Sequence, residues 1–139
     1  ARGAGAENIL GRPVEFGWHT VTPTEAGRRD PVLSTLGEGA PLFHWHLDTF
    51  TLPPGATHLA ASAQTPIQAF RIGRAVYGIQ FHFEADRTVV EQWSRDFAAV
   101  IADYAPDWPE RHPRDAARLG PKADAAARAI ARAWTGLLR

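Results

Sequence analysis

The sequence has no cysteine, no methionine and a single lysine. The absence of cysteine in particular excludes several kinds of site. Without cysteine it forms no disulfide and no cysteine-ligated zinc site, and it carries no thiol nucleophile of its own. No run of 18 apolar residues occurs, so no transmembrane helix is expected. Residues 1–8 lack the apolar segment of a signal peptide. We therefore expect a cytoplasmic protein that does not act at a membrane.

An excess of charge of either sign is also missing. The 15 basic and 15 acidic residues give a formal net charge of zero. Proteins that bind nucleic acid usually carry an excess of Lys and Arg to neutralise phosphates, so nucleic acid is not expected as a partner. The chain has 139 residues, of which 45% are apolar, and it includes five Trp and seven Phe. That is enough to form the core of a single domain.

The first two-thirds of the chain carry the pattern of strands. Residues 1–13 are rich in Gly and Ala and are expected to be a loop or linker. Alternation of apolar residues, with many aromatic and β-branched ones, predicts strands over 14–21, 42–46, 57–63, 67–72 and 75–81. A polar turn is expected over 22–29. Asp30 and Pro31 suit the cap and first position of a short helical turn that ends before Gly37. A tight turn at 73–74 predicts that residues 67–81 form a hairpin.

The last third carries the pattern of helices. Apolar residues recur at helical spacing over 88–104 and again over 123–138. The segment 107–113 contains Trp and Pro and is expected to be irregular. A short helix over 116–119 is expected to stop at Gly120 and Pro121, because proline removes a backbone donor. The strand over 75–81, the polar turn after it and the helical pattern over 88–104 follow one another as in the sites of α/β proteins.

The strand over 75–81 ends abruptly in two ionisable side chains, His82 and Glu84. Residues two apart in an extended segment point to the same side. A carboxylate at Glu84 can therefore accept a hydrogen bond from the His82 imidazole, orient it and raise its basicity. That supplies two members of a nucleophile–base–orienter triad, whose nucleophile has to come from elsewhere. The alternative is a strand end that carries two solvated polar groups.

A second polar cluster is formed by His44, His46 and Asp48. On a strand these three side chains share one face, and two His with a carboxylate are a plausible set of metal ligands. The alternative for His44 is a half-buried strand histidine without a ligand. Glu15 precedes an aromatic strand and is a candidate for a buried salt-bridge partner.

Four motifs in order resemble one family. The segment 78–84 (G-I-Q-F-H-F-E) resembles the G-x-Q-F-H-P-E motif of class I glutamine amidotransferases. Three further segments resemble motifs of the GMP synthase-like subgroup: 15–18 its E-I-G-W strand, 46–56 its H-G-D-x-F…L-P-x-G-A segment, and 61–71 its A-S-S…Q-A-F-R stretch. The resemblance covers nearly the whole chain.

The resemblance implies a fold and an activity. The fold is the C-terminal part of a flavodoxin-like amidotransferase domain of the α/β class, with a mixed sheet and flanking helices. The activity is hydrolysis of the glutamine side-chain amide to glutamate and ammonia by a Cys-His-Glu triad, often with ammonia passed to a synthase partner. His82 is implied as the general base and acid, and Glu84 as its orienter. Trp45, His46, Leu47 and Asp48 are implied to lie near the glutamine. The resemblance implies no metal ligand and no cofactor.

The sequence departs from the family in three ways. Phe83 stands where the family has Pro, and Leu47 replaces a small residue and is expected to crowd the glutamine site. The family's oxyanion-hole glycines and G-x-C-x-G nucleophile elbow do not occur in the chain. We therefore expect residues 1–139 to be a single incomplete domain, a fragment that alone hydrolyses no glutamine. A separate N-terminal half, a synthase partner or a second copy in a homodimer are its candidate partners.

Three alternatives to a glutamine-hydrolysing site remain at this point. One is a non-catalytic binding or assembly remnant of the same fold. Another is a γ-glutamyl hydrolase, which uses the same triad on a different γ-glutamyl compound. The third is a small β-rich metal-binding protein that uses His44, His46 and Asp48.

Overall fold

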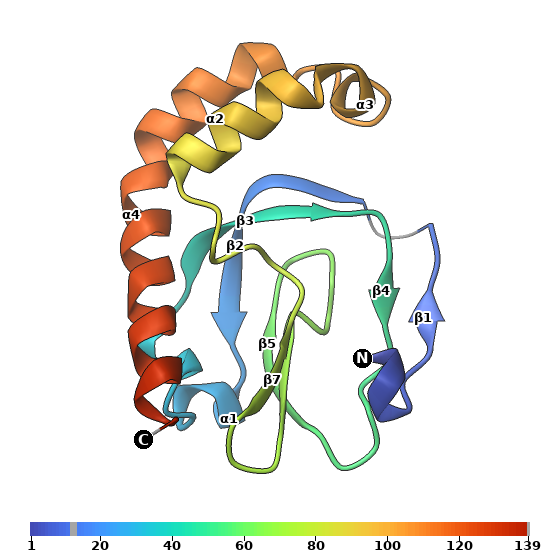
Figure 1. The fold of residues 1–139 in the computed structure, drawn as a ribbon, viewed down its shortest axis with the longest axis vertical. Coiled ribbons are helices and arrows are strands. Elements are labelled where there is room, and N and C mark those ends of the chain that lie inside the picture. Colours follow the sequence, from blue (N-terminus) through green and yellow to red (C-terminus); the bar gives the residue numbers. More distant parts are fainter. Residues whose placement is uncertain (12–13, 139) are drawn as a thin grey trace.

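The computed structural model describes residues 1–11 and 14–138. Figure 1 shows a curled sheet with one long helix along its side and two shorter helices above it. The strands are β1 Asn8–Ile9, β2 Glu15–Pro23, β3 Ala40–His46, β4 Thr49–Phe50, β5 Thr57–Ala61, β6 Ala69–Ile72 and β7 Val76–Ile79. The helices are α1 Glu25–Arg28, α2 Arg87–Asp96, α3 Ala98–Ala102 and α4 Trp108–Gly136, with 3-10 turns η1 Arg2–Ala4 and η2 Leu33–Leu36.

The main sheet has five strands in the order β3-β2-β5-β6-β7, and β1 and β4 form a separate pair. The α/β architecture with helices flanking a sheet is confirmed. The expectation of a mixed sheet is wrong for the described residues, because every strand pair among them is antiparallel. The predicted hairpin is formed by β6 and β7, with Ile72 opposite Val76. It places β7 at one edge of the sheet, so the chain beyond Ile79 is free to leave the sheet.

The curl of the sheet brings its two edges together at one point. β3 and β7 lie at opposite ends of the strand order. Beyond β7, however, the backbone N–H of His82 donates to the carbonyl oxygen of Phe43 on β3 at 2.7 Å, and the two residues form an isolated antiparallel bridge. The predicted strand 75–81 thus ends at Ile79, and the next residues cross to the far edge. His82 is held there against β3.

Two apolar cores lie on either side of the sheet. The first packs η2 and the second half of α4 against the sheet and contains Val32, Leu33, Leu42, Leu59, Phe81 and Ile130. The second is aromatic, packs α2, α3 and the start of α4 against β2 and β3, and contains Phe16, Trp18, Phe43, Val90, Ile101 and Trp108. Asp86 caps α2 by accepting a hydrogen bond from the backbone N–H of Val89 at 3.0 Å, so α2 begins shortly after Glu84.

The sequence-based expectation for 107–138 is wrong, because a single helix, α4, covers 108–136. Trp108 is 1% exposed and packs edge-on against Phe16 at 4.8 Å between ring centroids. This contact fixes the first turn of the helix in a segment that looked irregular. Gly17, at φ +101, leaves room beneath the helix, since a Cβ there would lie 3.0 Å from the Trp108 ring. Tertiary packing therefore overrides the local signal.

Proline and glycine do not interrupt α4 either. Pro113 and Pro121 both lie on its exposed face, where the carbonyl that each proline leaves without a partner can reach water. Gly120 is buried, and a Cβ there would lie 2.3 Å from Cδ of Arg87. The glycine lets Arg87 cross the helix and reach Asp124, with Nε 2.7 Å from its carboxylate. Gly120 thus serves as a contact point between α2 and α4 rather than as a helix end.

Three smaller differences from the sequence-based expectations remain. The predicted helix 88–104 is divided at Phe97 into α2 and α3. The expected polar turn 22–29 contains α1, capped by Thr24. The expected loop 1–13 contains η1 and β1 in its described part, while Arg12 and Pro13 lie outside the described residues. No helix in the described part of the chain is long and apolar enough to span a bilayer.

Candidate functional site

The structure brings His82 and Glu84 into direct contact. Nδ1 of His82 lies 2.6 Å from Oε1 of Glu84. Because an ionised carboxylate only accepts hydrogen bonds, Nδ1 carries the proton and donates it, which leaves the lone pair on Nε2. The side chains are 30% and 58% exposed, so solvent or a second chain can reach them. This is the arrangement of a base with its orienter.

The position of the His82 ring is set by its neighbours. Its backbone is tied to β3 through Phe43. The ring also meets Trp93 of α2 in an edge-to-face contact at 5.3 Å. Phe83, which stands where the family has Pro, packs against the first core. This contact anchors the backbone between His82 and Glu84, which in the family the proline ring would stiffen.

A second buried polar centre surrounds Glu15, which is 1% exposed at the start of β2. Its carboxylate accepts hydrogen bonds from Ser62 and Thr65, both at 2.6 Å, from Gln68 at 2.7 Å and from Nε2 of His46 at 3.0 Å. Burial raises the pKa of Glu15, but these hydrogen bonds and the nearby His44 outweigh it and hold the pKa below its usual range. Glu15 is therefore an ionised, fully engaged carboxylate.

His44 lies beside Glu15, but neither of its ring nitrogens has a hydrogen-bond partner among the residues that the structure describes. It is fully buried, and its Nδ1 is 3.8 Å from Oε2 of Glu15. Burial lowers the pKa of His44, and this effect exceeds the opposing attraction of Glu15. The ring is therefore neutral at pH 7. The expectation of a half-buried strand histidine is correct in kind, although the ring is buried more deeply.

The metal-ligand set that the sequence offered as an alternative, His44, His46 and Asp48, is not assembled within the described residues. Within the described residues, the group with metal-ligating geometry is Glu15, His44 and His46, whose ligand atoms lie within 4.8 Å of one another. The Asp48 side chain instead accepts a hydrogen bond from the backbone N–H of Gly11 at 2.7 Å. Oε2 of Glu15 already accepts three hydrogen bonds. This group therefore fits a hydrogen-bonded carboxylate better than an open metal site.

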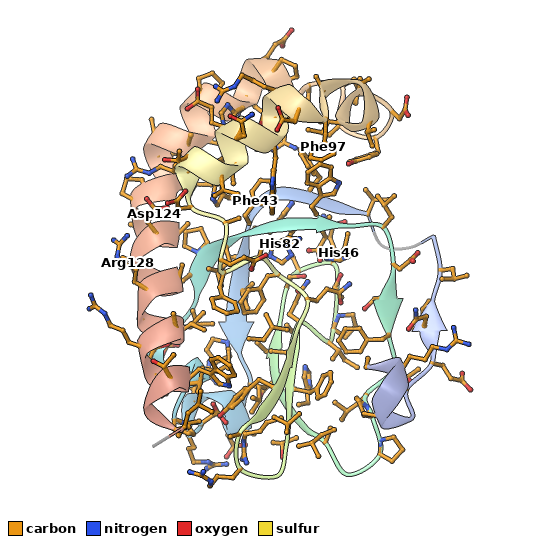
Figure 2. All side chains as sticks on the ribbon, viewed as in Figure 1. Phe43, His46, His82, Phe97, Asp124 and Arg128 are labelled. Carbon is orange, nitrogen blue, oxygen red and sulfur yellow. The ribbon has the colours of Figure 1, made fainter. Side chains whose placement is uncertain are left out.

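The four residues expected near the glutamine divide between two faces of β3. Trp45 points into the aromatic core and packs on Phe16 and Trp93. His46, Leu47 and Asp48 instead line an open depression together with Gln80. Leu47 is 43% exposed there. His82 and His46 both lie in the middle of the molecule beneath α2 and α3 in Figure 2, while Asp124 and Arg128 lie away from them on α4.

Sequence reasoning missed the partners that surround Glu15. Ser62, Thr65 and Gln68 lie just after the end of β5, and Gln68 is fully buried. In the sequence, Ser62 and Gln68 were noted only as parts of motifs that resemble the family, and no role was predicted for Thr65. The available signal was a set of polar residues between apolar strands. Their convergence on one carboxylate depends on how β2, β5 and β6 pair.

Comparisons with known proteins find similarity in sequence and in fold. No family model matches the chain. The glutamine amidotransferase-like protein YfeJ of Salmonella typhimurium is 40% identical over 89 residues, which are 64% of this chain and 37% of YfeJ. A glutamine amidotransferase from Methylobacillus flagellatus superposes on the whole chain with a TM-score of 0.74 and a sequence identity of 23%. A glutamine amidotransferase from Thermotoga maritima superposes on 99% of the chain with a TM-score of 0.70 and a sequence identity of 24%. The chain is thus similar in sequence to a glutamine amidotransferase-like protein and similar in fold to solved glutamine amidotransferases.

The amidotransferase relationship is partial in length. The chain spans 37% of YfeJ and 59% and 55% of the two solved structures. A GMP synthase-related protein from Thermoplasma acidophilum matches 58% of the chain and 40% of its own length at 28% identity, with a TM-score of 0.52. This match is in line with the GMP synthase-like subgroup. The likeness to the solved structures is one of fold, and the likeness to YfeJ is one of sequence over 89 residues.

Proposed function

We propose that this chain supplies the acid–base half of a glutamine amidotransferase site. His82 is the general base and acid, Glu84 orients it, and a cysteine from outside the chain is the nucleophile. The observation that carries the proposal is the 2.6 Å contact between Nδ1 of His82 and Glu84. The family relationship supplies the reaction class, hydrolysis of the glutamine side-chain amide.

The proposed reaction has two proton cycles, both through Nε2 of His82. First, Nε2 takes the thiol proton as the sulfur attacks the amide carbon, then returns it to the leaving nitrogen, which departs as ammonia and leaves a thioester. Next, Nε2 takes a proton from water, whose oxygen attacks the thioester, and returns that proton to the sulfur as glutamate leaves. The Glu84 carboxylate stabilises the imidazolium that forms in each cycle.

The substrate position in this proposal is the turn after β3. His46, Leu47 and Asp48 border a depression that opens to solvent, and in the family the corresponding backbone contacts glutamine. Trp45 contributes indirectly, because its ring packs on Trp93, which in turn contacts His82. The exposed Leu47 side chain occupies the place of a small residue and narrows the space for substrate.

The proposed reaction needs a partner that supplies the cysteine nucleophile. A second copy of this chain also lacks cysteine, so a homodimer does not complete the triad. The partner is a segment with the G-x-C-x-G elbow, alone or joined to a synthase that uses the ammonia. We call this chain expressed together with a segment that carries this elbow the completed protein.

Glu84→Gln in the completed protein tests the proposed pair. The amide cannot stabilise the imidazolium, so kcat for glutamate release should fall about 100-fold or more. Glu91→Gln is the matched control, because Glu91 is an exposed carboxylate on α2 that pairs with Arg95; its kcat should stay within about twofold of wild type. Equal rates for the Glu84 variant and wild type would rule the pair out as catalytic.

The same assay separates the alternatives. Glutamine and a γ-glutamyl dipeptide are offered in parallel to the completed protein. Preference for glutamine supports the amidotransferase, and preference for the dipeptide supports a γ-glutamyl hydrolase. Hydrolysis of neither, with the chain folded and the two segments bound to each other, supports a non-catalytic remnant.

A further inference from the structure

The buried carboxylate of Glu15 has no place in the proposed reaction, yet it contacts the turn that borders the substrate depression. We propose that Glu15 is a positioning residue which, through His46 and Gln80, holds the turn 46–48 in register with the chain that leads to His82. This inference rests on the proposed function for its kinetic part. Its structural part rests on the hydrogen bonds that connect Glu15, His46, Asp48 and Gln80.

The first step is that Glu15 itself cannot move. Three neutral donors from Ser62, Thr65 and Gln68 hold its two oxygens at 2.6–2.7 Å. These donors come from the connection between β5 and β6, whereas Glu15 begins β2. A buried, ionised carboxylate that accepts four hydrogen bonds has one favourable position. Glu15 therefore gives the neighbouring His46 ring a fixed point.

The second step runs through the two nitrogens of His46. Nε2 lies 3.0 Å from Glu15, and Nδ1 lies 2.9 Å from the backbone carbonyl of Asp48. In the tautomer that donates from Nε2 to Glu15, Nδ1 carries the lone pair and accepts a hydrogen bond from the side-chain amide of Gln80 at 2.9 Å. The same amide donates to the Asp48 carbonyl, so Gln80 links the ring to the turn that follows β3. Since the Asp48 carbonyl belongs to the substrate-facing turn, the direction of that turn depends on the orientation of the His46 ring.

The third step joins the turn to the catalytic segment. The side-chain amide nitrogen of Gln80 donates to the Asp48 carbonyl and lies 2.9 Å from Nδ1 of His46. Its amide oxygen accepts a hydrogen bond from Thr49 at 3.1 Å. Gln80 stands two residues before His82. The network from Glu15 therefore sets the spacing between the proposed glutamine contact and the proposed base.

Glu15→Gln breaks the network at its fixed point. The new amide keeps one acceptor oxygen, but its NH2 group faces donors from the surrounding side chains, so it cannot hold all four partners. The turn 46–48 should loosen while the His82–Glu84 pair stays intact. In the completed protein we expect KM for glutamine to rise about tenfold with kcat changed by about twofold or less, the signature of lost substrate positioning.

A second readout needs no activity. Backbone amide hydrogen exchange of the 139-residue chain should accelerate about tenfold or more over residues 46–50 in Glu15→Gln. Asp30→Asn is the matched control, because Asp30 is another buried carboxylate, held by backbone N–H groups of Val32 and Leu33 and by Tyr77. That variant should loosen η2 and leave residues 46–50 unchanged. If Glu15→Gln does not fold, Gln80→Met cuts the same path and should give the same exchange pattern.

Each result has a defined meaning. If exchange over 46–50 rises equally in both carboxylate variants, or not at all, Glu15 only supports the fold and the inference is overturned. If the exchange pattern appears but the completed wild-type protein hydrolyses nothing, the proposed function fails and the positioning of the turn stands. If wild type is active and KM is unchanged in Glu15→Gln, the positioning role fails and the proposed function stands.

Discussion

At the scale of residues, two buried polar groups determine how the chain responds to pH. Glu15 is ionised and accepts four hydrogen bonds, and His44 beside it is neutral, with no hydrogen-bond partner in residues 1–11 and 14–138. The pair His82 and Glu84 was predictable from the sequence, because spacing of two in an extended segment is a local property. The donors that meet Glu15 were not predictable, because they come from the β5–β6 connection and from the end of β3, which are distant from Glu15 in sequence.

His44→Leu should make the chain less sensitive to acid. Folding lowers the pKa of His44 from its ordinary value near 6.5. Below pH 6.5 the unfolded chain therefore binds a proton at His44 that the folded chain does not bind, and the free energy of unfolding decreases as the pH is lowered. Leucine removes this loss and also an unsatisfied buried ring. Urea unfolding followed by Trp fluorescence should show a loss of stability between pH 7 and pH 5 that is about 1–2 kcal/mol smaller in the variant. An equal loss in both proteins would mean that His44 titrates normally in the fold.

Tyr77 should resist ionisation in alkali. Burial, the negative charge of Asp30 and the hydrogen bond to it raise the pKa of Tyr77 to about 12. A raised pKa favours the neutral phenol, so its stabilising contribution is present below the ordinary value near 10 and is lost as the pH rises toward 12. Tyrosinate absorbance should appear at lower pH in Asp30→Asn than in wild type. The chain has two tyrosines, so a shift of Tyr77 changes a large part of the tyrosinate absorbance curve. An unchanged curve in Asp30→Asn would contradict the contact between Asp30 and Tyr77.

At the scale of elements, α4 shows where local signals fail. Trp, Pro and Gly predicted an irregular segment and a break, yet the helix runs through them (Figure 1). The reason is tertiary: Trp108 is buried against Phe16, and Gly120 accommodates Arg87. The β6–β7 hairpin was predictable because its turn and both strands are adjacent in sequence. The contact between β3 and His82 was not, because it depends on the curl of the whole sheet.

Two adjacent substitutions in α4 should have opposite effects. Pro121→Ala, on the exposed face, restores a backbone donor and should raise the unfolding free energy by about 1–3 kcal/mol. Gly120→Ala would place its Cβ 2.3 Å from Arg87 and displace it from Asp124, and should cost about 1 kcal/mol or more. Thermal and urea unfolding of both variants check this. A gain of stability in Gly120→Ala would show that α2 does not cross α4 at this point.

At the scale of the whole molecule, the curled sheet assembles a site from both of its edges. The segment after β7 delivers His82 and Glu84, and β3 delivers the turn 46–48. The chain covers only part of its amidotransferase relatives, and it contains no thiol. The central claim is therefore that glutamine hydrolysis needs His82 from this chain and a cysteine from another segment.

The most direct test of this claim is the rate of glutamate release from glutamine. It is measured under one condition for four samples: this chain alone, the cysteine-bearing segment alone, the completed protein, and the completed protein with His82→Ala. The account predicts sustained release by the completed protein only, with the His82 variant slower by about 100-fold or more. Release by the cysteine-bearing segment alone at the rate of the completed protein, or an undiminished rate in the His82→Ala protein, would contradict it.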